Sequence, residues 1–321
     1  MTTQTGTPQV TVMPDASAIT IRSDLGIIRV SGTDARTFLQ GQFTSDIQNL
    51  DKGQTQLSGY CTPKGRLLAI FRVIPYDDAL LLILPRELLA GIRKRLQLYV
   101  LRADVQLQDI SDDFGICELA GPDIAAWVPG VPDTDNSIIR TDELSVTRLP
   151  GDRLRLCVIG PMAALNTLRT QADQYITSVS AEAWRLLDIR AGLPTIYAAT
   201  SEMFVPQMTN LHQVGGVSFK KGCYTGQEVV ARMHYLGKQK KQLYRLHIAT
   251  EAPLQIGQPL YTPDSRGQAV GTIADQSPCQ DGGYEVLAVC QTNSIQQLSL
   301  TPDGPTNSDI CQRPLPYTNS D

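Results

Sequence analysis

Two short runs rich in β-branched residues begin the patterned part of the chain. Residues 19–22 and 27–30 consist mainly of isoleucine, valine and threonine, which favour strands, and a short polar stretch separates them. Asp34 then precedes a stretch with helical spacing that ends before Gly41. An aspartate before a helix and a glycine after it are typical capping residues. This part of the chain is predicted to run strand, strand, helix.

A buried strand followed by an amphipathic helix is predicted next. The apolar run 80–84 has the length of a strand, and Pro85 stands where the first turn of a helix tolerates proline. From Leu88 to Tyr99 the apolar residues recur every three or four positions, as on one face of a helix. A further strand is predicted over 105–110.

The same order of elements then returns. Residues 115–123 repeat the glycine and aspartate spacing of residues 26–34, and the strand and helix predicted over 154–169 repeat the order of 80–96. Two related α+β units of this kind predict a duplicated sandwich of sheet and helices with pseudo-twofold symmetry. Ligands often bind between such halves.

Short strands separated by glycine, proline and aspartate characterise the last part of the chain. They are predicted over 243–248, 270–273 and 284–289 and are typical of a small barrel or sandwich. We therefore predict two intertwined α+β units within 1–240 and a β domain over 241–321.

Composition and length are those of an ordinary globular protein. The 321 residues exceed what one core usually supports, and 42% of them are hydrophobic. The longest apolar run, 79–84, is far shorter than the roughly 20 residues needed to cross a bilayer. The first residues lack the features of a secretory or organelle-targeting signal. A cytoplasmic protein without a membrane span is expected.

The net charge of −4 argues against stable binding of nucleic acid, and the basic cluster 238–241 is interpreted as a solvated loop. The seven cysteines include no C-x-x-C pair, so neither a disulfide framework nor a zinc site is predicted. His212, His234 and His247 lack metal-ligand spacing and are assigned no ligand role.

Four glycines surround a single cysteine in residues 215–228. Glycine permits positive φ angles and close approach of a ligand to the backbone. Lys220 and Lys221 precede Cys223, and the residues after it can begin a helix, so positive charge and N–H groups are predicted near the sulfur, where they favour thiolate. A free cysteine is, however, usually a buried structural thiol. The residues alone leave both interpretations open.

Segments 204–211 and 215–228 together resemble the signature of the YgfZ family. The first reads Phe-Val-Pro-Gln-x-Thr-Asn-Leu, and the second ends in Lys-Lys-Gly-Cys-Tyr-Thr-Gly-Gln-Glu. Further matching pieces lie at 41–46, 184–194 and 314–317, so the resemblance extends over nearly the whole chain.

This resemblance implies a fold and a function. The family is related to GcvT, the folate-dependent aminomethyltransferase of glycine cleavage, which implies a three-domain cloverleaf of two α/β sandwich domains and a C-terminal β-barrel. It further implies binding of tetrahydrofolate or another folate, and an accessory role in assembly or repair of iron–sulfur enzymes such as those that thiolate transfer RNA. The essential cysteine of the family matches Cys223.

The resemblance also implies a set of site residues. A tryptophan of the family lines the folate site and matches Trp184, although a tryptophan on the apolar face of a helix is more often a core residue. A second family tryptophan is replaced here by Leu25. With Cys223 as the reactive thiol and no metal ligand, the implied cofactor-binding residues are Trp184, Lys221, Gly222, Tyr224, Gly226, Gln227 and Glu228.

Two other functions are weighed against this one. A folate-dependent one-carbon transferase needs a proton-handling group, but the segment that corresponds to the acidic stretch of the aminomethyltransferases, 63–72, contains no carboxylate. A cysteine hydrolase needs a histidine positioned to activate Cys223, and nothing in the sequence positions His212 or His234 in this way.

Overall fold

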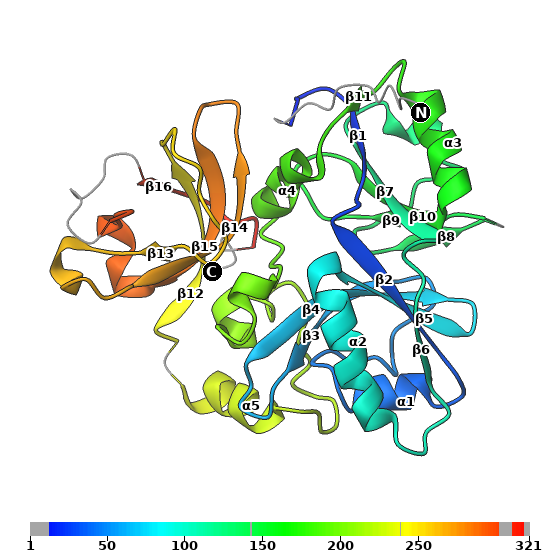
Figure 1. Ribbon diagram of the computed structural model, residues 1–321, viewed down its shortest axis with the longest axis horizontal. Helices are drawn as coiled ribbons and strands as arrows, with labels where there is room; N and C mark the ends of the chain where they lie inside the picture. Colours follow the sequence, from blue (N-terminus) through cyan, green and yellow to red (C-terminus); the bar gives the residue numbers. More distant parts are fainter. Residues whose placement is uncertain (1–12, 142, 238, 302–309, 318–321) are drawn as a thin grey trace, which may run out of the picture.

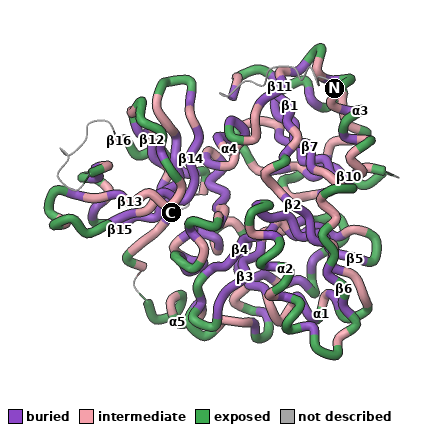
Figure 2. Tube along the Cα trace, viewed as in Figure 1, coloured by how far each residue is buried: buried purple, intermediate pink, exposed green. Residues whose placement is uncertain are grey.

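The computed structural model describes residues 13–141, 143–237, 239–301 and 310–317, which form three β-sheets with helices packed against them (Figure 1). This mixture of helices and sheets is the predicted α+β class. Buried positions are concentrated in the strands, whereas exposed positions are concentrated in the connecting segments (Figure 2). Within the described residues, no helix combines the length and the apolar character that a membrane span requires.

The first sheet is formed by one continuous part of the chain. Its elements are β2 (Leu25–Ser31), α1 (Ala35–Gln40), β3 (Gln56–Cys61), β4 (Leu67–Tyr76), β5 (Ala79–Pro85), α2 (Arg86–Val100) and β6 (Gln106–Asp109). The strands pair antiparallel in the order β3-β4-β5-β2-β6. Apolar side chains of α1 and α2 join those of the strands in one core. The strands and helices predicted in this region are confirmed.

The second sheet combines the first strand of the chain with much later ones. Its strands are β1 (Ala18–Ile21), β7 (Phe114–Ala120), β8 (Ile138–Arg140), β9 (Ser145–Arg148), β10 (Arg155–Pro161) and β11 (Thr177–Ser178). Their order is β11-β1-β7-β10-β9-β8, and only the β1–β11 pair is parallel. Helix α3 (Met162–Ala172) covers this sheet as predicted, whereas the predicted helix after Asp123 is a single 3₁₀ turn, η1 (Ile124–Trp127).

The first two strands of the chain belong to different sheets. β1 pairs with β7, while β2 pairs with β5 and β6. The chain crosses between the sheets at residues 22–24, and the Arg22 amide still donates to the Ile116 carbonyl at 2.9 Å. The crossing segment therefore lies at the junction of the two sheets.

The C-terminal sheet is open. Its elements are β12 (Lys241–Ile248), β13 (Pro259–Leu260), η4 (Pro263–Ser265), β14 (Gly271–Pro278), β15 (Tyr284–Gln291), η5 (Thr292–Gln297) and β16 (Ile310–Arg313). The order is β13-β14-β15-β12-β16, which contains all three predicted strands. In the part of the chain that the structure describes, no pairing of β13 with β16 closes the sheet into the predicted barrel.

The segment between the second and C-terminal sheets contacts both of them. It contains α4 (Ala181–Arg190), η2 (Ala198–Thr200), η3 (Pro206–Thr209) and α5 (Gln227–Leu236). Helix α4 packs against β14 and ends in Arg190, whose guanidinium lies 2.9 Å from the Glu285 carboxylate of β15. The Tyr317 hydroxyl donates to the Gly192 carbonyl at 2.9 Å, so the end of the chain returns to α4.

A buried carboxyl group lies at this junction. Asp275 is 1% exposed at an irregularity in β14, where it accepts a hydrogen bond from the Tyr197 hydroxyl at 3.0 Å. The Arg185 guanidinium is 3.7 Å from its other oxygen. Burial disfavours the carboxylate more than Arg185 favours it and raises the pKa of Asp275 to about 7.

An Asp275→Asn variant is expected to change the pH dependence of stability. The pKa of Asp275 is about 7 in the folded chain, whereas the pKa of an aspartate in an unfolded chain is near 4. Between about pH 4 and pH 7 the folded chain therefore keeps a proton on Asp275 that the unfolded chain has lost. The wild-type chain should therefore lose stability relative to the variant as the pH rises from about 4 to 7, by up to about 1.4 kcal/mol per pH unit. Urea unfolding across this range measures the difference, and parallel curves for both proteins would contradict it.

Candidate functional site

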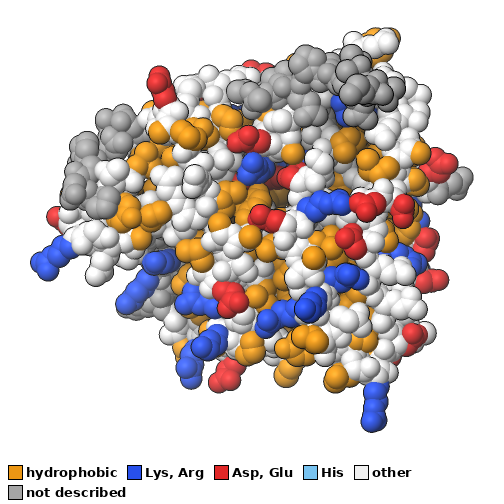
Figure 3. Space-filling view, in the orientation of Figure 1, with side chains coloured by type: hydrophobic (Ala, Val, Ile, Leu, Met, Phe, Trp, Pro, Cys, Tyr) orange, Lys and Arg blue, Asp and Glu red, His pale blue; other side chains and the backbone are white. Residues whose placement is uncertain are grey.

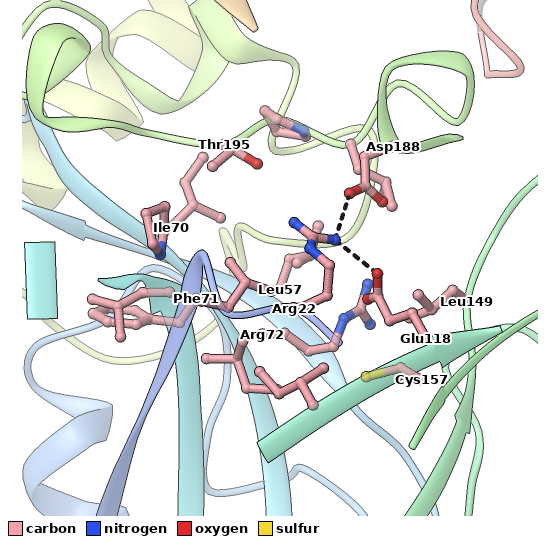
Figure 4. Close-up of a pocket in the computed structure, with 17 residues that line it drawn as sticks. Arg22, Leu57, Ile70, Phe71, Arg72, Glu118, Leu149, Cys157, Asp188 and Thr195 are labelled. Atoms are coloured by element: carbon pink, nitrogen blue, oxygen red, sulfur yellow. Dashed lines mark hydrogen bonds and ion pairs between the residues drawn. The ribbon is translucent and has the colours of Figure 1, made fainter. Parts of the chain in front are cut away.

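A narrow cavity lies where the first and second sheets meet α4 (Figure 4). Its volume is about 90 Å³, which is smaller than the roughly 300–1,000 Å³ typical of small-molecule sites. Hydrophobic side chains bordered by charged ones are visible at the centre of the molecular surface in Figure 3. The apolar lining residues include Leu25, Leu57, Ile70, Phe71, Ile83 and Leu149.

Arg22, in the segment that crosses between β1 and β2, is the central charged residue of this cavity. Its side chain is only 4% exposed and contacts three carboxylates, with Nε 2.8 Å from Asp24 and Nη1 2.7 Å from Glu118 and 3.4 Å from Asp188. Burial disfavours the charged guanidinium, but these carboxylates outweigh burial and raise the pKa of Arg22 above its ordinary value. Arg22 therefore remains a cation inside the protein.

The carboxyl groups of Glu118 and Asp188 differ in proton affinity. Burial raises the pKa of Glu118 above its ordinary value even though Arg22 opposes this effect. Burial also acts on Asp188, but Arg155 and Arg22 outweigh it and lower the pKa of Asp188. Arg155 is fully buried and donates to Asp188 at 2.5 Å. The cavity thus combines a firmly ionised carboxylate with one that binds a proton more readily.

Sequence reasoning missed these residues because they come from separate elements. Glu118 lies in β7, Arg72 in β4 and Asp188 in α4, and each lines the cavity. Arg72 is held by hydrogen bonds from its Nη1 to Thr55 and Asn136. A signal was present in the sequence, since a charged residue within an otherwise apolar strand must find a partner when it is buried. Glu118 and Arg72 are both charged residues within otherwise apolar strands.

The cysteine-containing segment lies elsewhere and is joined to the loop after α1. Thr44 Oγ1 donates to the Gly216 carbonyl at 2.6 Å and accepts from the Gly59 amide at 2.7 Å. The Ser218 amide donates to the Thr44 carbonyl at 2.9 Å. Two stretches that carry the family resemblance, far apart in the sequence, are therefore in direct contact.

Lys221 completes this junction. Its Nζ donates to the backbone carbonyls of Gln40, Phe43 and Ser45 at 2.6, 2.7 and 2.9 Å, and burial lowers the pKa of the ammonium group to about 8. All three N–H donors of the ammonium group are used in these bonds. The prediction that Lys221 contacts a cofactor would require one of them to break, so in this structure Lys221 holds the loop together.

Two glycines of the segment are required by their surroundings. A side chain at Gly216 would meet Leu211 at 2.3 Å, and one at Gly226 would meet the Thr62 carbonyl at 2.5 Å. Gly226 also has a φ of +85°, which favours glycine. These contacts place the start of α5 directly against the turn that joins β3 and β4. The glycines predicted to give ligand access thus serve close packing of the backbone at these two positions.

Cys223 is exposed and lies between two anchored positions, Lys221 and Gly226. Gly222 beside it is also exposed, with open space around its Cα, whereas Tyr224 is buried with Lys221 Nζ 5.1 Å from the centre of its ring. Gln227 and Glu228 form the first turn of α5, where Glu228 is exposed. The helix predicted after the cysteine is confirmed. The alternative of a buried structural thiol is wrong.

Trp184 does not share this environment. It is fully buried between the second sheet and the C-terminal sheet, in a core cluster with Ala18, Val179 and Cys279. It does not line the cavity, because the face of α4 that meets the cavity carries Asp188. The core interpretation of this tryptophan is therefore favoured, whereas Leu25, at the position of the second family tryptophan, does line the cavity.

The structure thus separates two regions that the sequence suggested were one. None of the eight predicted site residues lines the cavity, and seven of them lie together in residues 221–228. The β3–β4 hairpin connects the regions, since Leu57 and Phe71 line the cavity while the turn at its end meets Gly226. From Leu57 to Cys61 the strand spans on the order of 13 Å.

Two of the three histidines make local contacts. His234 stacks on Phe219 with ring centres 3.7 Å apart, and a ring nitrogen of His247 lies 2.9 Å from the Gly282 carbonyl. Burial lowers the pKa of His212. The described residues contain no cluster of three or more His, Cys, Asp and Glu suited to a metal ion. They also show no hydrogen bond between Cys223 and a histidine, which a cysteine hydrolase would use.

The fold is shared with a solved structure. The chain is similar to the glycine cleavage system aminomethyltransferase T from Bartonella henselae, with a TM-score of 0.73 over 87% of this chain and 80% of that one. Their sequences are 16% identical, so this similarity concerns the fold alone. The predicted GcvT-like fold is confirmed.

Sequence comparison then identifies the family. No family model matches the chain. It is 30% identical to the tRNA-modifying protein YgfZ of Colwellia psychrerythraea over 99% of this chain and 98% of that protein. It is 34% identical to the tRNA-modifying protein YgfZ of Photorhabdus laumondii over 92% of this chain and 91% of that protein. The chain belongs to the YgfZ family.

A Lys221→Met variant is expected to be destabilised by about 2 kcal/mol or more, because three carbonyls lose a charged donor. Lys220→Met is the matched control, since Lys220 is exposed and its replacement should change stability by less than about 0.5 kcal/mol. Urea unfolding of both variants gives the two values. Equal effects at the two positions would show that the carbonyl contacts of Lys221 contribute nothing.

Proposed function

We propose that the protein is a cytoplasmic, folate-binding accessory protein for the assembly or repair of iron–sulfur clusters, and that it supports iron–sulfur-dependent modification of transfer RNA. The observation that carries this proposal is the pairing of a small, largely apolar cavity that carries two carboxyl groups with a separate, exposed cysteine on a loop fixed at both ends. Tetrahydrofolate or another folate would occupy the cavity, and Cys223 would act on the cluster, a sulfur species or a partner thiol.

The cavity residues match the polarity of a folate ring system. Phe71 and Leu25 offer apolar walls to an aromatic ring system. Glu118 and Asp188 provide carboxyl oxygens, which accept hydrogen bonds from N–H groups at the edge of a pterin. A bound folate would carry the one-carbon chemistry of its class, and these residues would bind and orient it.

Exposure of Cys223 supports a role toward a macromolecular partner. A thiol at the surface is accessible to a protein-bound cluster or a persulfide, whereas a cavity would admit only small molecules. Stable iron–sulfur clusters usually take four ligands, and the described residues around Cys223 contain no group of metal ligands. A partner would therefore supply the remaining ligands, and the cluster would be cargo.

The alternative is a folate-dependent one-carbon transferase. It is favoured by the fold and by two carboxyl groups in the cavity, which the segment 63–72 does not itself provide. Both groups, however, are bound to guanidinium groups, Glu118 to Arg22 and Asp188 to Arg22 and Arg155. Despite burial, Arg155 and Arg22 lower the pKa of Asp188, which makes it a poor general base. The pKa of Glu118 is raised by burial, but its carboxyl group is occupied by the contact with Arg22. We therefore prefer the accessory role.

Replacement of Leu25 by alanine is expected to weaken folate binding about fivefold or more, because the variant loses apolar contact with the ligand. Leu98→Ala is the matched control, since Leu98 is 69% exposed on α2 and does not line the cavity. Calorimetric titration with 5-formyltetrahydrofolate gives both affinities. If the wild-type chain shows no saturable binding, or if both variants bind like it, the cavity is not the folate site.

A Cys223→Ala variant is expected to abolish support of iron–sulfur-dependent transfer-RNA thiolation in a bacterial strain that lacks its own relative of this protein. Cys311→Ala is the control, because Cys311 is also exposed but lies in β16. Thiolated nucleosides are quantified by mass spectrometry, and urea unfolding verifies that both variants are folded. Full restoration by Cys223→Ala would refute the role of the thiol and favour chemistry confined to the cavity.

A further inference from the structure

Helix α5 exposes several of its apolar side chains. Of its ten residues, only Val230 is buried, whereas Tyr235 and Leu236 are 66% and 83% exposed. The last turns of α2 are similar, with Leu98 69% and Tyr99 45% exposed. Soluble proteins seldom leave such groups of large apolar side chains uncovered without a binding function.

Positive charge is concentrated around the same two helices. Residues 86–102 and 220–241 contain eleven Lys and Arg but only two Asp and Glu, whereas the rest of the chain contains 17 Lys and Arg and 30 Asp and Glu. The net charge of −4 therefore conceals a strong asymmetry. Figure 3 shows Lys and Arg side chains gathered over the lower part of the molecule, where Figure 1 places α2 and α5.

A chain of contacts connects the two helices past the cysteine. The guanidinium of Arg95 in α2 acts on Tyr60, and Tyr60 packs against Phe43 with ring centres 5.9 Å apart. The Phe43 carbonyl accepts from Lys221, two residues before Cys223. The exposed residues of α2, of α5 and of the cysteine loop lie along this chain of contacts and make up one candidate surface. We call it the α2–α5 face and define it by Lys94, Tyr99, Lys220, Cys223, Arg232 and Tyr235.

We propose that the α2–α5 face binds RNA. Exposed Lys94, Lys220 and Arg232 provide the cations that contact phosphates, and Tyr99 and Tyr235 provide exposed rings on which unpaired bases stack. The His234 ring stacks on Phe219 and also contacts the Tyr235 ring edge-to-face, with the two ring centres 4.8 Å apart. These contacts hold the Tyr235 ring against the protein.

Exposed tyrosines among cations favour RNA over an acidic protein segment as the occupant. An acidic segment would use the cations but has no need for exposed aromatic rings, whereas an RNA loop offers phosphates and unstacked bases together. The expectation from net charge that no stable nucleic-acid complex forms is thus replaced by binding confined to one face. The inference does not depend on folate, since the cavity and this face share no residue named here.

The experiment measures fluorescence anisotropy of a labelled, unmodified transfer-RNA transcript with the full-length protein at several salt concentrations. We expect micromolar affinity at about 100 mM salt that falls as salt rises. The double variant Lys94→Glu with Arg232→Glu should weaken binding at least about tenfold. The control is Arg266→Glu with Arg313→Glu, which changes net charge equally at exposed positions of the C-terminal sheet and should alter affinity less than about twofold.

Stacking is tested separately. Tyr99→Ala with Tyr235→Ala should weaken binding by about tenfold while leaving the salt dependence unchanged, because bases and not phosphates lose their contact. The proposal is overturned by absence of saturable binding, by equal losses in the two charge-reversal variants, or by tyrosine variants that bind like wild type. Displacement of the transcript by poly-glutamate at equal charge concentration would instead assign the face to an acidic protein.

Discussion

The buried guanidinium of Arg22 is the interaction on which the arrangement of the first two sheets depends. The chain leaves one sheet and enters the other within residues 22–24, so Arg22 lies between the strands of two sheets. Its guanidinium therefore needs partners from other elements. Its contacts with Glu118 of the second sheet and Asp188 of α4 fasten three parts of the molecule at one point. Removal of one partner from such a buried pair typically costs about 3–5 kcal/mol. The same contacts provide the polar part of the cavity.

The family signature has a structural task that its chemistry does not reveal. Lys221 and Thr44 fasten the cysteine loop to the segment after α1, and Gly226 allows α5 to start against the β3–β4 turn. These residues hold Cys223 at the surface in one position. Several residues of the signature therefore fix the loop that carries Cys223.

Prediction from sequence succeeded where the relevant residues are adjacent in the chain. Strands, helices and the cysteine segment follow from local patterns, and the helix after Cys223 lies where expected. The cavity could not be predicted in this way, since Arg22, Glu118 and Asp188 meet only through the crossing of the chain between sheets. Trp184 was assigned to a ligand by resemblance, but helical spacing already favoured the core, where it lies.

The interleaved order of the strands has a consequence for synthesis of the protein. All strands of the first sheet are available once residue 109 has left the ribosome, so this sheet can assemble early. β1 precedes it in the chain but pairs with β7 and β11, the latter at Thr177–Ser178, and must wait unpaired while roughly a hundred residues are made. Because domains fold as they emerge, the nascent chain passes through a stage in which one sheet is complete and Arg22 still lacks Glu118 and Asp188.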